Sequence, residues 1–295
     1  FGSWDAGVQH YNPQTDRFDQ LPVDPDQGKH GEASGTKLND LMVWNIFEDR
    51  HNDLWFSTHY GGLTRFERST GTYYFHVSNE EDKQSLSSTV VWVSYEDSHG
   101  RFWVGTAYGL NLMDREKGTF KRYIPDNQNP RSLANGSILA IHEDHKGRVW
   151  FGTDMGLHLY HPESDDFTHY DAQNGFADQG IRAIIEDQFG NLWLGTNNGI
   201  VRFNPDTLAV KNYTRYNGEL IRGGATGAAP ASTTTGRCSP TSTASSSPTT
   251  RPSGARSATR PPGSTSRTSP CRSRRTATRW RTPGASAAWG SGYGR

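Results

Sequence analysis

Apolar and polar residues alternate in short stretches through the first 222 residues of the chain, a pattern typical of half-buried β-strands. Such stretches surround Ile46, Ile141 and Ile184, and each predicts the first strand of a structural unit. A Glu-Asp pair follows each stretch, in most cases with a Gly soon after it, and these residue types favour a tight turn. The pattern therefore predicts an all-β fold of short antiparallel strands joined by turns.

The same pattern occurs four times, in segments that begin near residues 43, 91, 138 and 181. In each segment a Trp-x-Gly-Thr sequence, or a close variant of it, predicts a second strand. A glycine turn then leads to a third strand, and an aromatic residue marks a fourth. The repeated Trp residues are Trp55, Trp103, Trp150 and Trp193, which are 48, 47 and 43 residues apart. A period in the forties with four strands per repeat is typical of a β-propeller blade.

The first 18 residues resemble the second half of a repeat. Gly2-Ser3 aligns with Ser57-Thr58, and Gly7-Val8 aligns with Gly62-Leu63. The sequence thus predicts an incomplete β-propeller over residues 1–222, with four full four-stranded blades and a half-blade at 1–18. We expect the chain to be a fragment of a longer protein, because an open array of blades leaves strand edges and an apolar blade face uncovered.

The composition changes sharply near residue 222. The chain contains 31 basic and 31 acidic residues, but residues 1–222 carry a net charge of −11 and residues 223–295 carry +11. The second segment contains no Leu, Ile, Val, Met or Phe, so it cannot offset an ordering cost of about 1–2 kcal/mol per residue. We expect a disordered low-complexity tail or the product of a reading-frame shift, with a glycosylated stalk or a nucleic-acid-binding arm as the alternatives. Cys238 and Cys271 both lie in this tail, and no transmembrane helix is predicted.

The repeat resembles the two-component regulator propeller repeat, because Glu-Asp, Trp-x-Gly-Thr and the following Gly recur in register. The connectors also match this family at Ser85-Leu86 and Ser132-Leu133. The resemblance covers roughly residues 1–222. It departs from the pattern at Ser57, which replaces a Gly, and at Asn52-Asp53, which replace the turn Gly.

The resemblance implies a ligand-sensing region outside the cytoplasm, in the periplasm, as part of a bacterial inner-membrane receptor. In this family the parent protein is a hybrid histidine kinase or a diguanylate cyclase, while the blades themselves perform no catalysis. The implied ligand is a small molecule or an oligosaccharide. The implied partners are the remaining blades, the downstream signalling domains and a second copy in a homodimer, and no nucleic acid is expected.

Residues with catalytic potential are better explained by the fold. The Glu-Asp pairs recur at the same turn in every blade, whereas catalytic carboxylates are normally unique. His158 and His161 are three residues apart on a predicted strand, so they point to opposite faces and predict no metal site. No nucleotide-binding, hydrolase or zinc motif is present. We therefore expect no catalytic residue, no metal and no cofactor.

The best candidates for ligand contact are two positions that vary within Trp-x-Gly-Thr-x-x-Gly. They lie on turns at one rim of the blades, and their aromatic and amide groups suit the apolar face and the hydroxyl groups of a sugar. The predicted ligand-binding residues are Trp4, His59, Tyr60, Tyr108, Asp154, Asn197 and Asn198.

Three alternatives to this interpretation remain. In the first alternative, the seven predicted ligand-binding residues are ordinary exposed turn residues. In the second, the blades form a protein–protein interaction scaffold. The third is an enzyme of the lyase type on a propeller, similar to the streptogramin lyases, which a unique cluster of His and Glu on one rim would favour.

Overall fold

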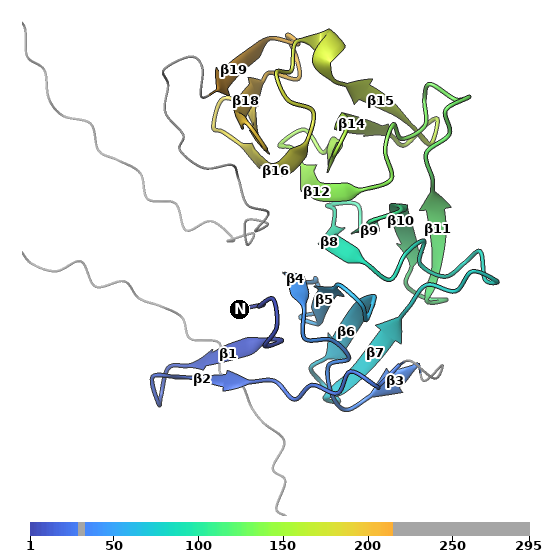
Figure 1. Ribbon diagram of the computed structural model, residues 1–295, viewed down its shortest axis with the longest axis vertical. Helices are drawn as coiled ribbons and strands as arrows, with labels where there is room; N and C mark the ends of the chain where they lie inside the picture. Colours follow the sequence, from blue (N-terminus) through green and yellow to red (C-terminus); the bar gives the residue numbers. More distant parts are fainter. Residues whose placement is uncertain (29–32, 215–295) are drawn as a thin grey trace, which may run out of the picture. The chain divides into compact units, whose positions relative to one another are not determined.

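The computed structural model describes residues 1–28 and 33–214 (Figure 1). The predicted tail at 223–295, with its alternatives, lies outside these residues. The described part is all-β apart from one short 3-10 helix, η1 (Ala172–Asn174). This confirms the predicted fold class.

Four consecutive segments each form an antiparallel sheet whose strands are ordered as in the sequence. The first blade contains β4 (Val43–Glu48), β5 (Leu54–Thr58), β6 (Leu63–Glu67) and β7 (Thr72–His76), and β3 (Ser34–Gly35) pairs with β7. The second blade contains β8 (Val91–Glu96), β9 (Phe102–Thr106), β10 (Gly109–Asp114) and β11 (Thr119–Tyr123). The third contains β12 (Ile138–Glu143), β13 (Val149–Thr153), β14 (Gly156–His161) and β15 (Asp166–Tyr170). The fourth contains β16 (Ile181–Glu186), β17 (Leu192–Thr196), β18 (Gly199–Phe203) and β19 (Val210–Thr214).

The predicted half-blade is also present. β1 (Gln9–Asn12) pairs with β2 (Arg17–Gln20), and an isolated bridge joins Gly2 to Val8. Ser57 and Leu63 pair in the same way in the first blade, so the half-blade reproduces the later strands of a full one.

The hydrophobic cores lie between neighbouring blades. Trp55 of the first blade contacts Phe102 of the second at 4.3 Å between ring centroids, and Trp103 contacts Phe151 of the third at 5.2 Å. The first strands β4, β8, β12 and β16 contact one another in succession and form the inner edge of the row of blades (Figure 1). Each blade is therefore held mainly by its two neighbours, as in other repeat proteins.

The Asp of each Glu-Asp pair fixes the repeated Trp within its own blade. The indole Nε1 donates to an Asp oxygen at 2.8–2.9 Å in all four blades. The other carboxylate oxygen accepts backbone N–H groups of the following turn, such as those of Lys146 and Arg148 for Asp144. Burial opposes the ionisation of Asp144, but the hydrogen bonds from Trp150 and Arg148 outweigh it and hold the pKa of Asp144 below its usual value.

In the second, third and fourth blades the Glu of the pair reaches back to the preceding blade, whereas Glu48 of the first blade pairs with Arg68 of its own blade. Glu143 accepts a hydrogen bond from the backbone N–H of Ser98 at 2.8 Å, and Glu186 accepts one from the N–H of His145 at 2.9 Å. Glu96 accepts one from Arg50 in the same way at 3.0 Å. Both acids of the pair thus hold the fold, and we call the Glu contact the inter-blade clip.

Candidate functional site

Each first strand carries an irregularity at the same place. Its register with the second strand shifts across one residue. Such a bulge frees a side chain from the regular pleat and redirects it. The residues at these positions, which we call the bulge residues, are Trp44, Trp92, Leu139 and Arg182.

The bulge residues contact the variable turns that the sequence singled out. The ring of Trp44 lies 4.8 Å from that of Trp4 in the half-blade. Arg182 forms an ion pair with Asp154 in the turn of the preceding blade, with 3.1 Å between Nη2 and Oδ1. Trp92 likewise contacts Trp44 and His59 of the blade before it. We call the bulge residues together with the variable turn residues the rim.

One part of the rim is aromatic. Trp44 lies between Trp4 and Trp92, with 4.9 Å between the centroids of Trp44 and Trp92 and interplanar angles of 87° and 67°. The indole Nε1 of Trp44 donates to Nδ1 of His59 at 3.3 Å. This hydrogen bond leaves Nε2 of His59 to carry the ring proton. His59 in turn lies against Tyr60, with 4.4 Å between the ring centroids.

The rim is polar at the fourth blade. Besides its pair with Asp154, Arg182 donates from Nε to Oδ1 of Asn197 at 3.1 Å. The planar guanidinium thus holds two turns from two blades in a fixed orientation. The turn also carries Asn198, whose backbone N–H donates to Thr196 Oγ1 at 3.3 Å.

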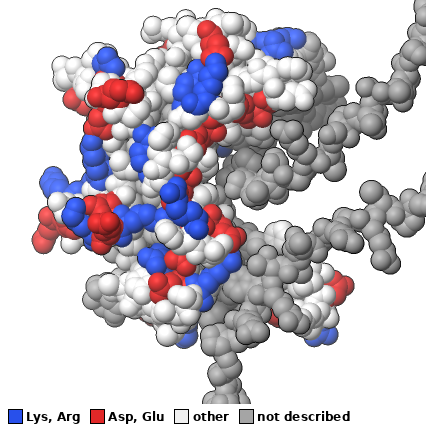
Figure 2. Space-filling model, turned by 180° about the vertical axis from the view of Figure 1, so that it is seen from behind, with Lys and Arg blue, Asp and Glu red and all other residues white. Residues whose placement is uncertain are grey.

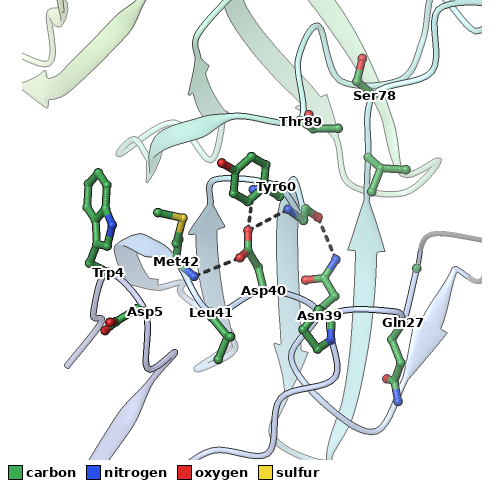
Figure 3. A pocket seen from close by; sticks show the side chains of 14 residues that line it. Trp4, Asp5, Gln27, Asn39, Asp40, Leu41, Met42, Tyr60, Ser78 and Thr89 are labelled. Atoms are coloured by element: carbon green, nitrogen blue, oxygen red, sulfur yellow. Dashed lines mark hydrogen bonds between the residues drawn. The ribbon is translucent and has the colours of Figure 1, made fainter.

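A pocket of about 590 Å³ adjoins the aromatic part and has Trp4 and Tyr60 in its wall (Figure 3). Asp40 is buried in this wall, where it accepts hydrogen bonds from the backbone N–H groups of Tyr60, Gly61 and Met42. The Asp40 carboxylate is therefore occupied in fixing the turn that presents Tyr60. The volume falls within the usual range for small-molecule sites.

The structure brings most of the predicted site residues together in two groups. Trp4, His59 and Tyr60 join the aromatic part of the rim, while Asp154 and Asn197 meet through Arg182. Tyr108 instead lines a different pocket of about 850 Å³ along β10 and β11. Whether these residues bind a ligand stays a prediction.

The sequence interpretation missed the bulge residues. The second residue of the first strand differs among the four blades, while the residues around it repeat. It is Trp in the first two blades, Leu in the third and Arg in the fourth. This is the same signal that identified the variable turns, and it was sufficient to find these positions.

His158 and His161 are each engaged in contacts within the fold. His158 is buried, and its Nε2 accepts a hydrogen bond from the backbone N–H of Ala134 at 3.0 Å, whereas His161 contacts Thr168. Burial, together with the neighbouring His169, lowers the pKa of His158 to about 3. Among residues 1–28 and 33–214, no group of three or more His, Cys, Asp or Glu side chains is arranged to hold a metal ion.

The His–Glu contacts repeat from blade to blade. His145 pairs with Glu186, and His99, one position further along its turn, lies 3.8 Å from Glu143. Because the arrangement recurs, it belongs to the inter-blade clip and gives no support to a lyase site. Figure 2 shows acidic and basic side chains interspersed over one face of the blades, in keeping with ion pairs such as Arg148–Asp206.

These observations define a β-propeller region that combines repeated inter-blade contacts with a rim whose chemistry changes from blade to blade. Residues 37–60, 85–108, 132–155 and 175–198 match the pattern of the two component regulator propeller family. The four repeats of this chain belong to that family, which confirms the resemblance seen in the sequence.

Solved structures share the same fold. The extracellular domain of the hybrid two component system BT3049 from B. thetaiotaomicron superposes with a TM-score of 0.55 at 21% identity, over 68% of this chain and 26% of that one. The extracellular domain of the one component system BT4673 from the same organism gives 0.51 at 20% identity, over 72% and 33%. PorZ, a surface component of the type-IX secretion system of Porphyromonas gingivalis, gives 0.51 at 16%, over 74% and 32%.

The chain spans about a quarter to a third of the length of these three proteins. No curated protein matches its sequence. In the part of the chain that the structure describes, no helix has the length and apolar character needed to cross a membrane.

Proposed function

We propose that this chain is part of the ligand-sensing region of a membrane-bound two-component or related signalling receptor, and that its rim binds a carbohydrate outside the cytoplasm. The family of the four repeats supports a role in signalling. The fold shared with extracellular domains of one and two component systems supports the location. On this proposal the chain performs no catalysis, and its partners are further blades, the signalling domains of its parent and a second copy of the receptor.

The observation that carries the carbohydrate proposal is the row of Trp4, Trp44 and Trp92, together with the polar group of Arg182, Asp154 and Asn197 at the equivalent positions of the third and fourth blades. Indole rings stack on the apolar C–H face of a sugar ring, and amide, carboxylate and guanidinium groups bond its hydroxyls. A mixture of these groups is unusual at a purely structural turn, because large exposed aromatic side chains gain nothing there from burial.

The rim also supplies a route from binding to signalling. Trp44 contacts Trp4 of the half-blade, and Arg182 contacts Asp154 of the third blade. A ligand at the rim therefore touches more than one blade at once. By binding one arrangement of neighbouring blades more tightly than another, it shifts the population between them.

Isothermal titration calorimetry of the 295-residue protein against a broad panel of mono- and oligosaccharides tests the proposal. We expect at least one glycan to bind, and the Trp92→Ala variant to lose most of that affinity. Phe189→Ala is the matched control, because Phe189 is 77% exposed in a turn of the fourth blade outside the rim. If no member of the panel binds, the carbohydrate proposal is wrong. Turnover of a bound glycan would indicate the lyase alternative, and binding only to another protein would indicate the scaffold.

A further inference from the structure

We propose that the ligand is a neutral oligosaccharide which occupies two adjoining compartments, one unit on the Trp44–Trp92 platform and the next in the pocket beyond Trp4 and Tyr60. This inference rests on the proposed function and narrows it, since it excludes both single sugars and acidic glycans as the preferred ligand.

The platform is rigid before any ligand arrives. Trp44 and Trp92 are half-buried on neighbouring first strands, and the bulge in each strand sets the direction of the side chain. The hydrogen bond from Trp44 to His59 fixes the indole further. Adjacent rings meet edge to face, with the edge of one ring against the face of the next, so the two indoles form an angled aromatic surface. A fixed aromatic surface binds with little loss of side-chain entropy.

The platform and the pocket adjoin through shared residues. Trp4 contacts Trp44 and also lines the pocket, while Tyr60 lines the pocket and contacts His59. Figure 3 shows Trp4 and Met42 on one side of the pocket and Ser78 and Thr89 on the other, with Tyr60 between them. A linear ligand stacked on Trp44 therefore has a continuous path into the pocket, which a single sugar ring leaves unused.

The pocket lining selects against negative charge. Among the described residues (1–28 and 33–214), its lining contains two acids, Asp5 and Asp40, and no Lys, Arg or His. Asp40 is occupied by backbone N–H groups. The side chains of Asp5, Ser78 and Thr89 make no hydrogen bond to another of the described residues and are open to the hydroxyl groups of a ligand. A carboxylate or sulfate here would meet Asp5, with no cation in the described part of the lining to offset it, and like charges at close range repel.

The apolar wall of the pocket suits the C–H surface of a sugar. Pro25, Leu41, Met42 and Val77 line it and present no charged group. Hydroxyls on one side and aliphatic carbon on the other match the two faces of an uncharged pyranose ring.

The test is a length and charge series in calorimetry with the 295-residue protein. The probes are neutral gluco-, manno-, galacto- and xylo-oligosaccharides of one to six units, with oligogalacturonates and sulfated oligosaccharides of the same lengths. We expect affinity to rise by about tenfold or more from one unit to two or three, which corresponds to about 1.4 kcal/mol, and then to level off. Acidic probes should bind more weakly than neutral ones of equal length.

Two variants separate the compartments. Trp44→Ala should lower the affinity for every length by about tenfold or more, with circular dichroism used to verify the fold and Trp44→Phe, which keeps a ring, expected to retain part of the affinity. Thr89→Val keeps the volume of the side chain and removes its hydroxyl. It should weaken binding of the longer probes several-fold and leave the single sugars unchanged. Phe189→Ala should bind as the wild type does.

Equal affinity for one unit and three, preference for an acidic probe, or unchanged binding of the longer probes to Thr89→Val would each overturn this inference. Glycan binding would still be present in those cases, so the proposed function would stand. Absence of binding to any probe would overturn the proposed function and, with it, the inference.

Discussion

Removing the carboxylate of Asp144 should destabilise the third blade more than any other single acid-to-alanine change there. Asp144 accepts hydrogen bonds from Nε1 of Trp150 at 2.9 Å, Nε of Arg148 at 2.6 Å and the backbone N–H groups of Lys146 and Arg148 at 3.0 Å. Trp150 is fully buried between the third and fourth blades. In Asp144→Ala its indole N–H has no acceptor and no access to water.

The magnitude follows from these partners. An unpaired buried donor costs about 1–3 kcal/mol, and each lost hydrogen bond in the partly exposed turn costs about 0.5–1.5 kcal/mol. We therefore expect Asp144→Ala to lower the free energy of unfolding by about 3–4 kcal/mol, which is a large part of the 5–15 kcal/mol typical of a folded domain. Asp206→Ala is the control, because its half-exposed side chain forms only surface pairs with Lys146 and Arg148, worth about 1 kcal/mol or less.

The assay is urea denaturation followed by circular dichroism at 25 °C on a double-mutant cycle. Trp150→Phe removes the N–H that Asp144 satisfies, so Asp144→Ala should cost about 1–2 kcal/mol less in that background. A loss below about 1 kcal/mol in Asp144→Ala alone, or purely additive effects in the double variant, would refute the reasoning.

Three further predictions concern stability. Glu143→Gln weakens the inter-blade clip to Ser98, and we expect the free energy of unfolding, measured by urea denaturation, to fall by about 1 kcal/mol. An unchanged free energy of unfolding would contradict a stabilising role of the clip. His158 is uncharged when folded and its pKa is lowered to about 3, so the stability that it supports is complete above pH 6.5 and falls by about 2 kcal/mol by pH 5.0, at 1.36 kcal/mol per unit. His158→Asn introduces the residue type of Asn111, which is the equivalent hydrogen-bond acceptor in the second blade. The denaturation midpoint of this variant should depend less on pH between 7.5 and 5.0 than that of the wild type. An unchanged pH dependence would exclude His158 as the cause. Leu208 has φ of 58° and is 55% exposed, so Leu208→Asn should raise the unfolding free energy by about 1 kcal/mol, and an equal or lower melting temperature would contradict this.

The blades were predictable because their information is local and repeated. Alternation indicated the strands, and Glu-Asp followed by Gly indicated the turns. Asn52 shows why one departure was harmless: it adopts φ of 64°, close to the glycines at the equivalent turns, and Asn tolerates this conformation better than most residues.

The partners of the Glu-Asp pair were not predictable from the pattern alone. Glu143 meets a backbone N–H 45 residues earlier, and nothing near it in the sequence indicates such a partner. The rim was predicted in part, since Trp4, His59 and Tyr60 do gather. Trp44 was missed because simple alternation assigns each strand residue to one of two faces, whereas the bulge at this position redirects the side chain.

The inter-blade clip points in one direction, since Glu96, Glu143 and Glu186 each accept a backbone N–H of the blade before their own. The acceptor Glu belongs to the later blade and the donor is a backbone N–H of the earlier one, a group that every residue except proline carries, so the clip itself does not depend on the side chain of its partner. The bulge and turn positions are not involved in this fastening. Substitutions at the rim therefore leave the hydrogen bonds of the clip in place, so the ligand proposed for the rim can change without loss of this contact, while rim residues such as Arg182 add inter-blade contacts of their own.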